Sequence, residues 1–215
     1  MSSGLTMSTD KDESESGSKF FLCESTSIFS KLSVGVTFVS LIFQIVSVAC
    51  PYWIIAEVRG KQAIHGGLWV ECSLANIFTT REQWVCLSFS AAHHLEKLPR
   101  FLKAVQAMAI LVLICLVTCT FLLALYAILP KLQGRKMALF SALGCVVFAA
   151  LFGLIGGSVF AADYPTPQDL LGLHHWTFGF AFAFQWLVVA LCLIVVVLIV
   201  VDMRSSLLIK SLRFF

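Results

Sequence analysis

Four long apolar stretches constrain the fold of this chain more than any other feature. A helix needs about 20 apolar residues to cross the hydrocarbon core of a bilayer, and it satisfies its own backbone hydrogen bonds, as lipid requires. The four stretches are approximately Leu32–Tyr52, Ala104–Leu129, Met137–Ala162 and Phe178–Val201. We therefore predict an all-α membrane protein built on a four-helix transmembrane bundle.

The composition agrees with a membrane protein and argues against several classes of function. Of the 215 residues, 59% are hydrophobic and 13% are charged, whereas soluble domains are about half apolar and one quarter charged. The net charge of +3 is too small to indicate a nucleic-acid partner. The chain has no nucleophile triad, phosphate-binding loop or paired-carboxylate site, and its spans carry almost none of the ionisable groups that mark transporters. We expect no enzymatic activity, no cofactor and no nucleic-acid binding.

Basic residues give the expected orientation. They gather in the link between the second and third spans and in the C-terminal tail, whereas the link between the last two spans has acidic residues and no Lys or Arg. Because basic loops stay in the cytoplasm, we predict a plasma-membrane protein with both termini cytoplasmic and with outer loops at 53–103 and 163–177. We expect a disordered tail over 1–31, a four-span domain over 32–203 and a second tail over 204–215.

The first outer loop carries strand signals and two cysteines. Residues 53–58, Leu68–Ser73 and Gln83–Phe89 read as strands, and Arg59-Gly60-Lys61 reads as a turn. Disulfides persist outside the cell, so we predict that Cys72 and Cys86 link the last two strands of a small antiparallel sheet. Gly66-Gly67 predicts a bulge or a close backbone approach.

Tryptophans in the same loop suit the boundary between the sheet and the bilayer, because indole combines an apolar ring with a polar N–H. Trp53 and Trp69 are predicted to lie there.

A strip of small residues runs along one face of the third span, at every fourth position. The predicted helix-packing residues on it are Ala149, Gly153, Gly157 and Ala161. Small side chains let helix backbones approach closely, either within the bundle or between two copies. The sequence leaves both alternatives open.

Two other groups of residues suggest a lipid modification or a metal site. Cys23 precedes the first span on the predicted cytoplasmic side and is a candidate palmitoylation site. The pairs His93-His94 and His174-His175 suggest zinc, but adjacent side chains diverge and make a poor chelate. We predict no metal site.

The spacing of Trp53, Gly67-Leu68-Trp69, Cys72 and Cys86 resembles the loop signature of a tetraspan superfamily. That superfamily comprises claudins, peripheral myelin protein, epithelial membrane proteins and calcium-channel gamma subunits. Two span openings, Leu102–Leu111 and Phe178–Trp186, resemble those of the myelin and epithelial membrane proteins, and the resemblance covers about residues 32–201. Claudins usually have an Arg where this chain has Gln106.

The resemblance implies a claudin-like fold and a structural role at cell–cell contacts or apposed membranes, in adhesion or a paracellular barrier. It implies the lipid bilayer and either self-association or related tetraspans, in cis or in trans, as partners. The alternative that it implies is an auxiliary, gamma-type subunit regulating an ion channel or receptor. The same scaffold serves all of these roles.

Overall fold

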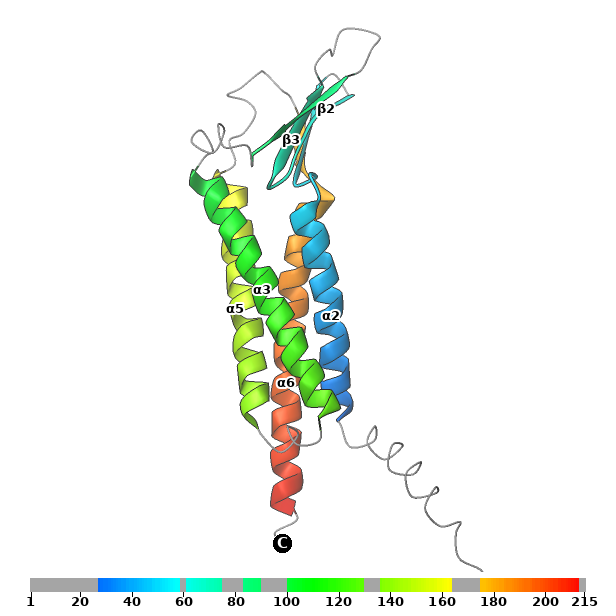
Figure 1. The fold of residues 1–215 in the computed structure, drawn as a ribbon, viewed down its shortest axis with the longest axis vertical. Helices are drawn as coiled ribbons and strands as arrows, with labels where there is room; N and C mark the ends of the chain where they lie inside the picture. The colour runs from blue at the N-terminus through cyan, green and yellow to red at the C-terminus, as the bar shows by residue number, and fades with distance from the viewer. Residues whose placement is uncertain are drawn as a thin grey trace, which may run out of the picture.

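The computed structural model of the protein describes residues 27–58, 61–74, 83–89, 100–129, 136–163 and 175–212. Within these ranges the chain forms four helices and five strands (Figure 1). The helices are α2 (Ile28–Ala49), α3 (Arg100–Ile128), α5 (Lys136–Asp163) and α6 (Phe180–Leu212). The strands are β1 (Ile54–Val58), β2 (Lys61–Gly66), β3 (Val70–Leu74), β4 (Trp84–Ser88) and β5 (His175–Phe178).

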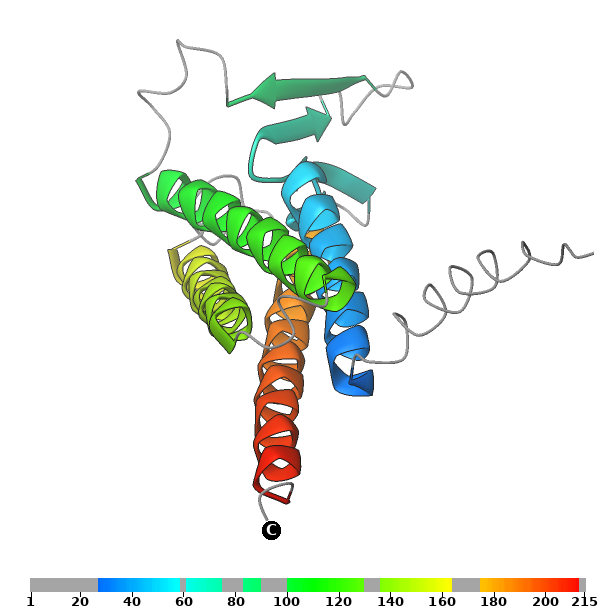
Figure 2. The ribbon, with the colours of Figure 1, turned by 60° about the horizontal axis from the view of Figure 1, so that its bottom comes forward.

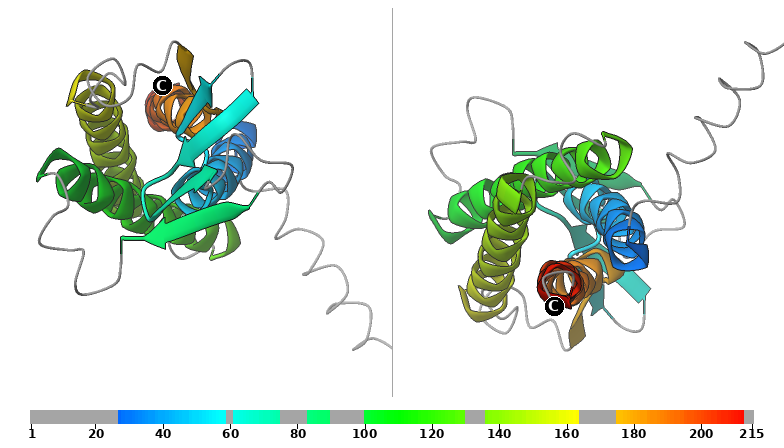
Figure 3. Two further views of the ribbon diagram at one scale, coloured as in Figure 1. Left: turned by 90° about the horizontal axis from the view of Figure 1, so that it is seen from above. Right: turned by 90° about the horizontal axis from the view of Figure 1, so that it is seen from below.

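The four helices form the predicted membrane bundle. Each is long and apolar enough to cross a membrane. They contact one another in the order α2, α3, α5 and α6, which closes back on α2, as the view from below shows (Figure 3). Branched and small side chains such as Val112, Leu116 and Val195 fill the centre, while Phe121 and Phe148 point outward and are exposed. Apolar side chains both inside and outside the bundle are expected in a bilayer, because lipid tails are as apolar as the protein core.

The helix ends differ from the predicted spans for local reasons. Ser27 caps α2, because its Oγ accepts a hydrogen bond from Phe29 N at 3.2 Å, and α2 therefore begins at Ile28. It ends at Ala49, two residues before Pro51. Helix α6 continues to Leu212, past the predicted end at Val201, and protrudes below the other helices (Figure 2). Hydropathy detects only the apolar part of a helix, and a helix can continue into polar sequence.

The strands form one antiparallel sheet in the order β4-β3-β2-β1-β5, which lies over one end of the bundle (Figure 1). Strand β1 follows α2 directly and β5 precedes α6 directly, so the pairing of β1 with β5 joins the ends of these two helices. The sheet therefore continues the α2–α6 side of the bundle.

The sequence correctly predicted strands at β1, β3 and β4, but other parts of the prediction were wrong. Lys61 begins β2 instead of completing a turn, and Leu68 and Trp69 lie in the turn between β2 and β3 instead of in a strand. Strand β5 was not predicted. Lys61–Gly66 has no Phe, Tyr or Trp and only one β-branched residue, and β5 has only four residues. Both are strands because they pair with β1.

Candidate functional site

The sheet and its attachment to the bundle form the candidate functional site. The predicted disulfide is present: Cys72 and Cys86 are joined with an Sγ–Sγ distance of 2.06 Å. The two residues are direct partners in the β3–β4 register. Strand β4 is the edge of the sheet, so the disulfide attaches this outer strand covalently to β3.

The signature tryptophans Trp53 and Trp69 cap the end of α2. The last carbonyls of a helix have no partner inside it, and lipid supplies none. Trp53 Nε1 donates to Ser47 O at 2.7 Å, and Trp69 Nε1 donates to Val48 O at 2.9 Å. One carbonyl further back, Val46 O accepts from the backbone N–H of Cys50 at 3.0 Å. Both indoles thus satisfy helix-end carbonyls and tie the sheet to α2.

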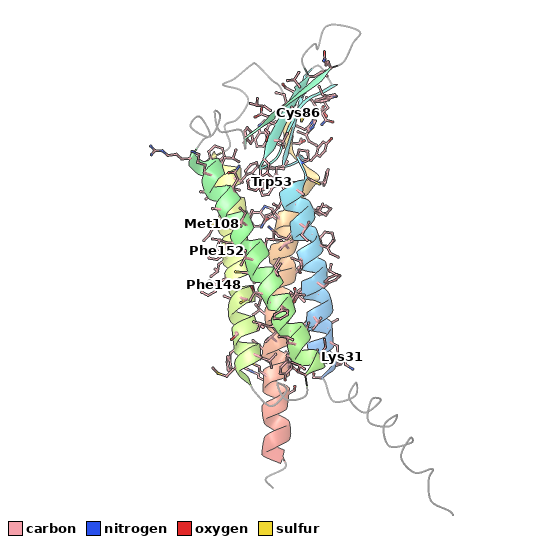
Figure 4. The ribbon with its side chains drawn as sticks, viewed as in Figure 1. Lys31, Trp53, Cys86, Met108, Phe148 and Phe152 are labelled. Carbon is pink, nitrogen blue, oxygen red and sulfur yellow. A yellow bond between two sulfur atoms is a disulfide. The ribbon has the colours of Figure 1, made fainter. Side chains whose placement is uncertain are left out.

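Trp53, which Figure 4 shows where the sheet meets the bundle, also contacts two further helices. Its side chain is only 1% exposed. Its ring packs edge-on against Phe160 of α5 and Phe182 of α6, with centroid separations of 4.8 and 5.8 Å. Because the ring is enclosed by protein, Trp53 is a structural joint between the sheet and the bundle.

The Gly-Leu-Trp turn is held on both sides. A Cβ on Gly67 would lie 2.6 Å from Pro51 Cα and 2.8 Å from Cys50 O, so the predicted close backbone approach is present. Leu68 is fully buried, and its carbonyl accepts a hydrogen bond from Gln106 Nε2 of α3 at 2.6 Å. Gln106, noted in the sequence only through the resemblance, thus fixes the turn to α3.

A second glycine, Gly179, secures the opposite side of the sheet. Its N–H donates to Trp53 O at 2.9 Å, and a Cβ there would collide with Tyr52 O. Ser47 Oγ donates to Ala181 O at 2.8 Å, which links α2 to the start of α6. Sequence reasoning missed Gly179, although its position between the aromatic residues of β5 and α6 was visible in the sequence.

The family is decided by comparison with known proteins. The model of the PMP-22/EMP/MP20/Claudin family matches residues 26–199. The chain belongs to this family. A search of curated proteins finds no match. Family membership, four apolar helices and the stapled sheet together make the chain a multi-pass membrane protein with a claudin-like fold.

Strand β4 is the exposed part of this claudin-like sheet. Trp84, Val85 and Leu87 are 42%, 51% and 47% exposed. The strand pairs with β3 on one side, and no strand of the described residues pairs with its other side. Figure 3, seen from above, shows β4 at the rim of the sheet. An apolar strand with a free backbone edge can add another strand.

His65 lies within an aromatic stack on this sheet. Its ring stacks on Tyr52 at 4.7 Å and contacts the ring of Trp84 at 4.8 Å. Its Nδ1 is buried and has no hydrogen-bond partner within the part of the chain that the structure describes. Burial lowers the pKa of His65 below its ordinary value of 6.5, whereas burial raises the pKa of Glu71 above 4.5. His65 thereby connects the outer strand to Tyr52, beside the bundle.

Of the small residues predicted to pack on α5, three are buried in the bundle and one is exposed. Ala149 is buried, and a Cβ on Gly153 would lie 2.9 Å from Val189 Cγ2 of α6. A Cβ on Gly157 would lie 3.4 Å from the Trp186 ring, also on α6. Ala161 is exposed. The two glycines therefore allow close approach of α5 and α6 within one molecule.

Some predicted sites lie outside the described residues: Cys23, His93, His94 and His174. Among the described residues, no three His, Cys, Asp or Glu side chains form a metal-binding group.

Proposed function

We propose that this protein is a structural and interaction protein of cell–cell contacts or apposed membranes, where it contributes to adhesion or a paracellular barrier. Its sheet would face outside the cell and both termini would be cytoplasmic. The charge pattern supports this orientation. Lys31 lies at the bundle end opposite the sheet (Figure 4), as expected for a cytoplasmic end.

The observation that carries the proposal is the exposed edge of β4. Native proteins usually shield such an edge with charges, proline or a covering segment. Here Val85 and Leu87 are both about half exposed, and the Cys72–Cys86 disulfide holds the strand in place. A fixed apolar edge is suited to binding a strand from a neighbour, with main-chain hydrogen bonds supplying affinity.

The occupant that we propose for this edge is β4 of a second copy or of a related tetraspan. Antiparallel pairing of two identical edges follows from a two-fold axis, the commonest symmetry of homo-oligomers. Such pairing also covers the apolar side chains of both partners.

The orientation is tested with an epitope tag on the C-terminus of the full chain expressed in cells. The proposal predicts antibody binding only after permeabilisation. Binding to intact cells would contradict it.

The function is tested in mixed cultures of expressing and non-expressing cells. We expect the protein to concentrate at borders between two expressing cells and not at borders with non-expressing cells. An even surface distribution, together with co-purification of a channel, would instead support a gamma-type auxiliary subunit and overturn the proposal.

A further inference from the structure

The buried face of α2 is polar over the whole length of the helix. Every buried side chain on α2 carries a hydroxyl or an amide: Ser30, Ser33, Thr37, Ser40, Gln44 and Ser47. The large apolar side chains of the same helix, such as Phe38 and Ile42, are exposed instead. In a membrane the polar groups must find partners inside the bundle, because lipid provides none.

Most of these hydroxyls find partners nearby. Ser33, Thr37 and Ser40 donate to carbonyls of their own helix at 2.7–2.8 Å. Ser47 donates to Ala181 O of α6. These hydroxyl groups therefore already donate to backbone carbonyls and do not donate to other groups in the bundle.

Two buried amides, one on α2 and one on α6, each have a carbonyl oxygen that accepts no hydrogen bond from the described residues. Gln44 of α2 is 0% exposed and Gln185 of α6 is 2% exposed. Gln44 Nε2 donates to Ala109 O of α3 at 3.3 Å, and Gln185 Nε2 lies 3.0 Å from the position that a Cβ on Gly153 would take. Both Oε1 atoms are buried, and no group of the described residues donates a hydrogen bond to them.

Neighbouring contacts place the two amides at the same level. Phe43 and Phe184, each adjacent in sequence to one of the glutamines, have ring centroids 5.1 Å apart. The Ser47–Ala181 hydrogen bond lies one turn away. On the α5 side, a Cβ on Gly153 would lie 3.0 Å from Gln185 Nε2, so the amide of Gln185 packs against a glycine.

We propose that Gln44 and Gln185 form a binding site for a buried water molecule, which donates one hydrogen bond to each Oε1. Two buried acceptors require two donors, and water is the small molecule that supplies both. Lipid esters only accept hydrogen bonds, and a single lipid hydroxyl donates only one. Buried waters characteristically bridge polar groups that have no other partner.

The test is hydroxyl-radical footprinting of the full chain in lipid nanodiscs. In the apolar interior, radiolytic labelling occurs next to bound water, so Phe43 and Phe184 serve as reporters. We expect both to be labelled in the wild type, and the labelling to be lost in Gln44→Met and Gln185→Met, which keep the side-chain length. Ser40→Ala is the matched control, since Ser40 bonds its own helix, and should leave the labelling unchanged.

An unlabelled Phe43–Phe184 pair in the wild type would overturn the proposal, because it would show that no water is bound in this layer. Labelling that persists in both Met variants would overturn it as well. If a variant does not fold, the labelling of Phe43 and Phe184 in the wild type still tests the proposal.

Discussion

Two glycines show at the scale of single residues how tightly the sheet is attached. Gly67 lies against the backbone of Cys50 and Pro51, and Gly179 lies against the backbone of Tyr52. Both glycines are therefore in close contact with the backbone of the short segment that links α2 to β1. Backbone atoms cannot move aside as the end of a flexible side chain can, so any Cβ at these positions must displace the linker.

We expect Gly67→Ala and Gly179→Ala each to destabilise the protein by about 1–3 kcal/mol or more, the usual cost of overpacking. Thermal unfolding of the purified protein and delivery to the cell surface would measure this loss. Gly35→Ala and Gly144→Ala are matched controls, because an added Cβ at either site meets nothing within 4 Å. Equal melting temperatures for all four variants would contradict the assignment.

His65 predicts a pH dependence for the sheet. Burial lowers its pKa in the folded state, so the folded protein favours the neutral ring and the unfolded chain binds a proton more readily. The stability that His65 contributes is therefore present above pH 6.5, its unfolded pKa, and is lost as the pH falls below that value. Glu71 acts in the opposite direction, because its raised pKa favours the protonated, folded state at low pH.

The corresponding measurement is thermal unfolding between about pH 7.5 and about pH 5.5, the range in which histidine titrates. We expect the melting temperature to fall with pH in the wild type and to fall less in His65→Phe, which keeps an aromatic ring between Tyr52 and Trp84. Identical slopes for both proteins would rule out His65 as the source.

At the scale of secondary-structure elements, the end of α2 depends on tryptophans from the sheet. Replacing Trp53 or Trp69 with Phe keeps a ring but removes the N–H that bonds Ser47 O or Val48 O. A buried acceptor left without a donor costs about 1–3 kcal/mol. We expect each variant to unfold at lower temperature by a corresponding amount. Trp84→Phe, in an exposed position of β4, should unfold like the wild type, and a comparable loss there would contradict the capping role.

The disulfide sets the stability of the outer strand. Cys72 and Cys86 close a loop with a sequence separation of 14 residues, and removing such a link costs about 3 kcal/mol in the chain-entropy model. We expect Cys72→Ser and Cys86→Ser to reduce surface delivery to a similar extent, since either removes the same bond. A membrane-impermeant thiol reagent should label both cysteines only after reduction. Labelling without reduction would contradict the bond.

The sequence predicts best the elements whose signal is local. Span length and apolarity locate all four helices, and the spacing of Trp53, Cys72 and Cys86 locates the stapled sheet. Strands β2 and β5 escape prediction because their stability comes from pairing with β1, and β5 is distant from β1 in sequence. The contacts of Gln106 and Gly179 with the sheet are likewise long-range, so no local pattern reveals them.

At the scale of the whole molecule, the chain has two parts: a bundle suited to lipid and a sheet that lies beyond one end of the bundle. The bundle exposes apolar side chains all around, as lipid requires, and the sheet continues directly from α2 and into α6. Because β1 and β5 pair with each other at the ends of these helices, the sheet has a fixed position on the bundle. In the proposed orientation, this arrangement presents the edge of β4 to neighbouring molecules.

The most direct measurement of the central claim is the enrichment of β4 variants at cell borders in mixed cultures. Leu87→Lys places a charge on the apolar edge, and lysine on an edge strand opposes pairing. We expect Leu87→Lys to reach the surface and to lose its enrichment at borders between two expressing cells. Gln62→Lys, which adds the same charge at an exposed polar position of β2, should be enriched like the wild type. Undiminished enrichment of Leu87→Lys would contradict β4 as the contact surface.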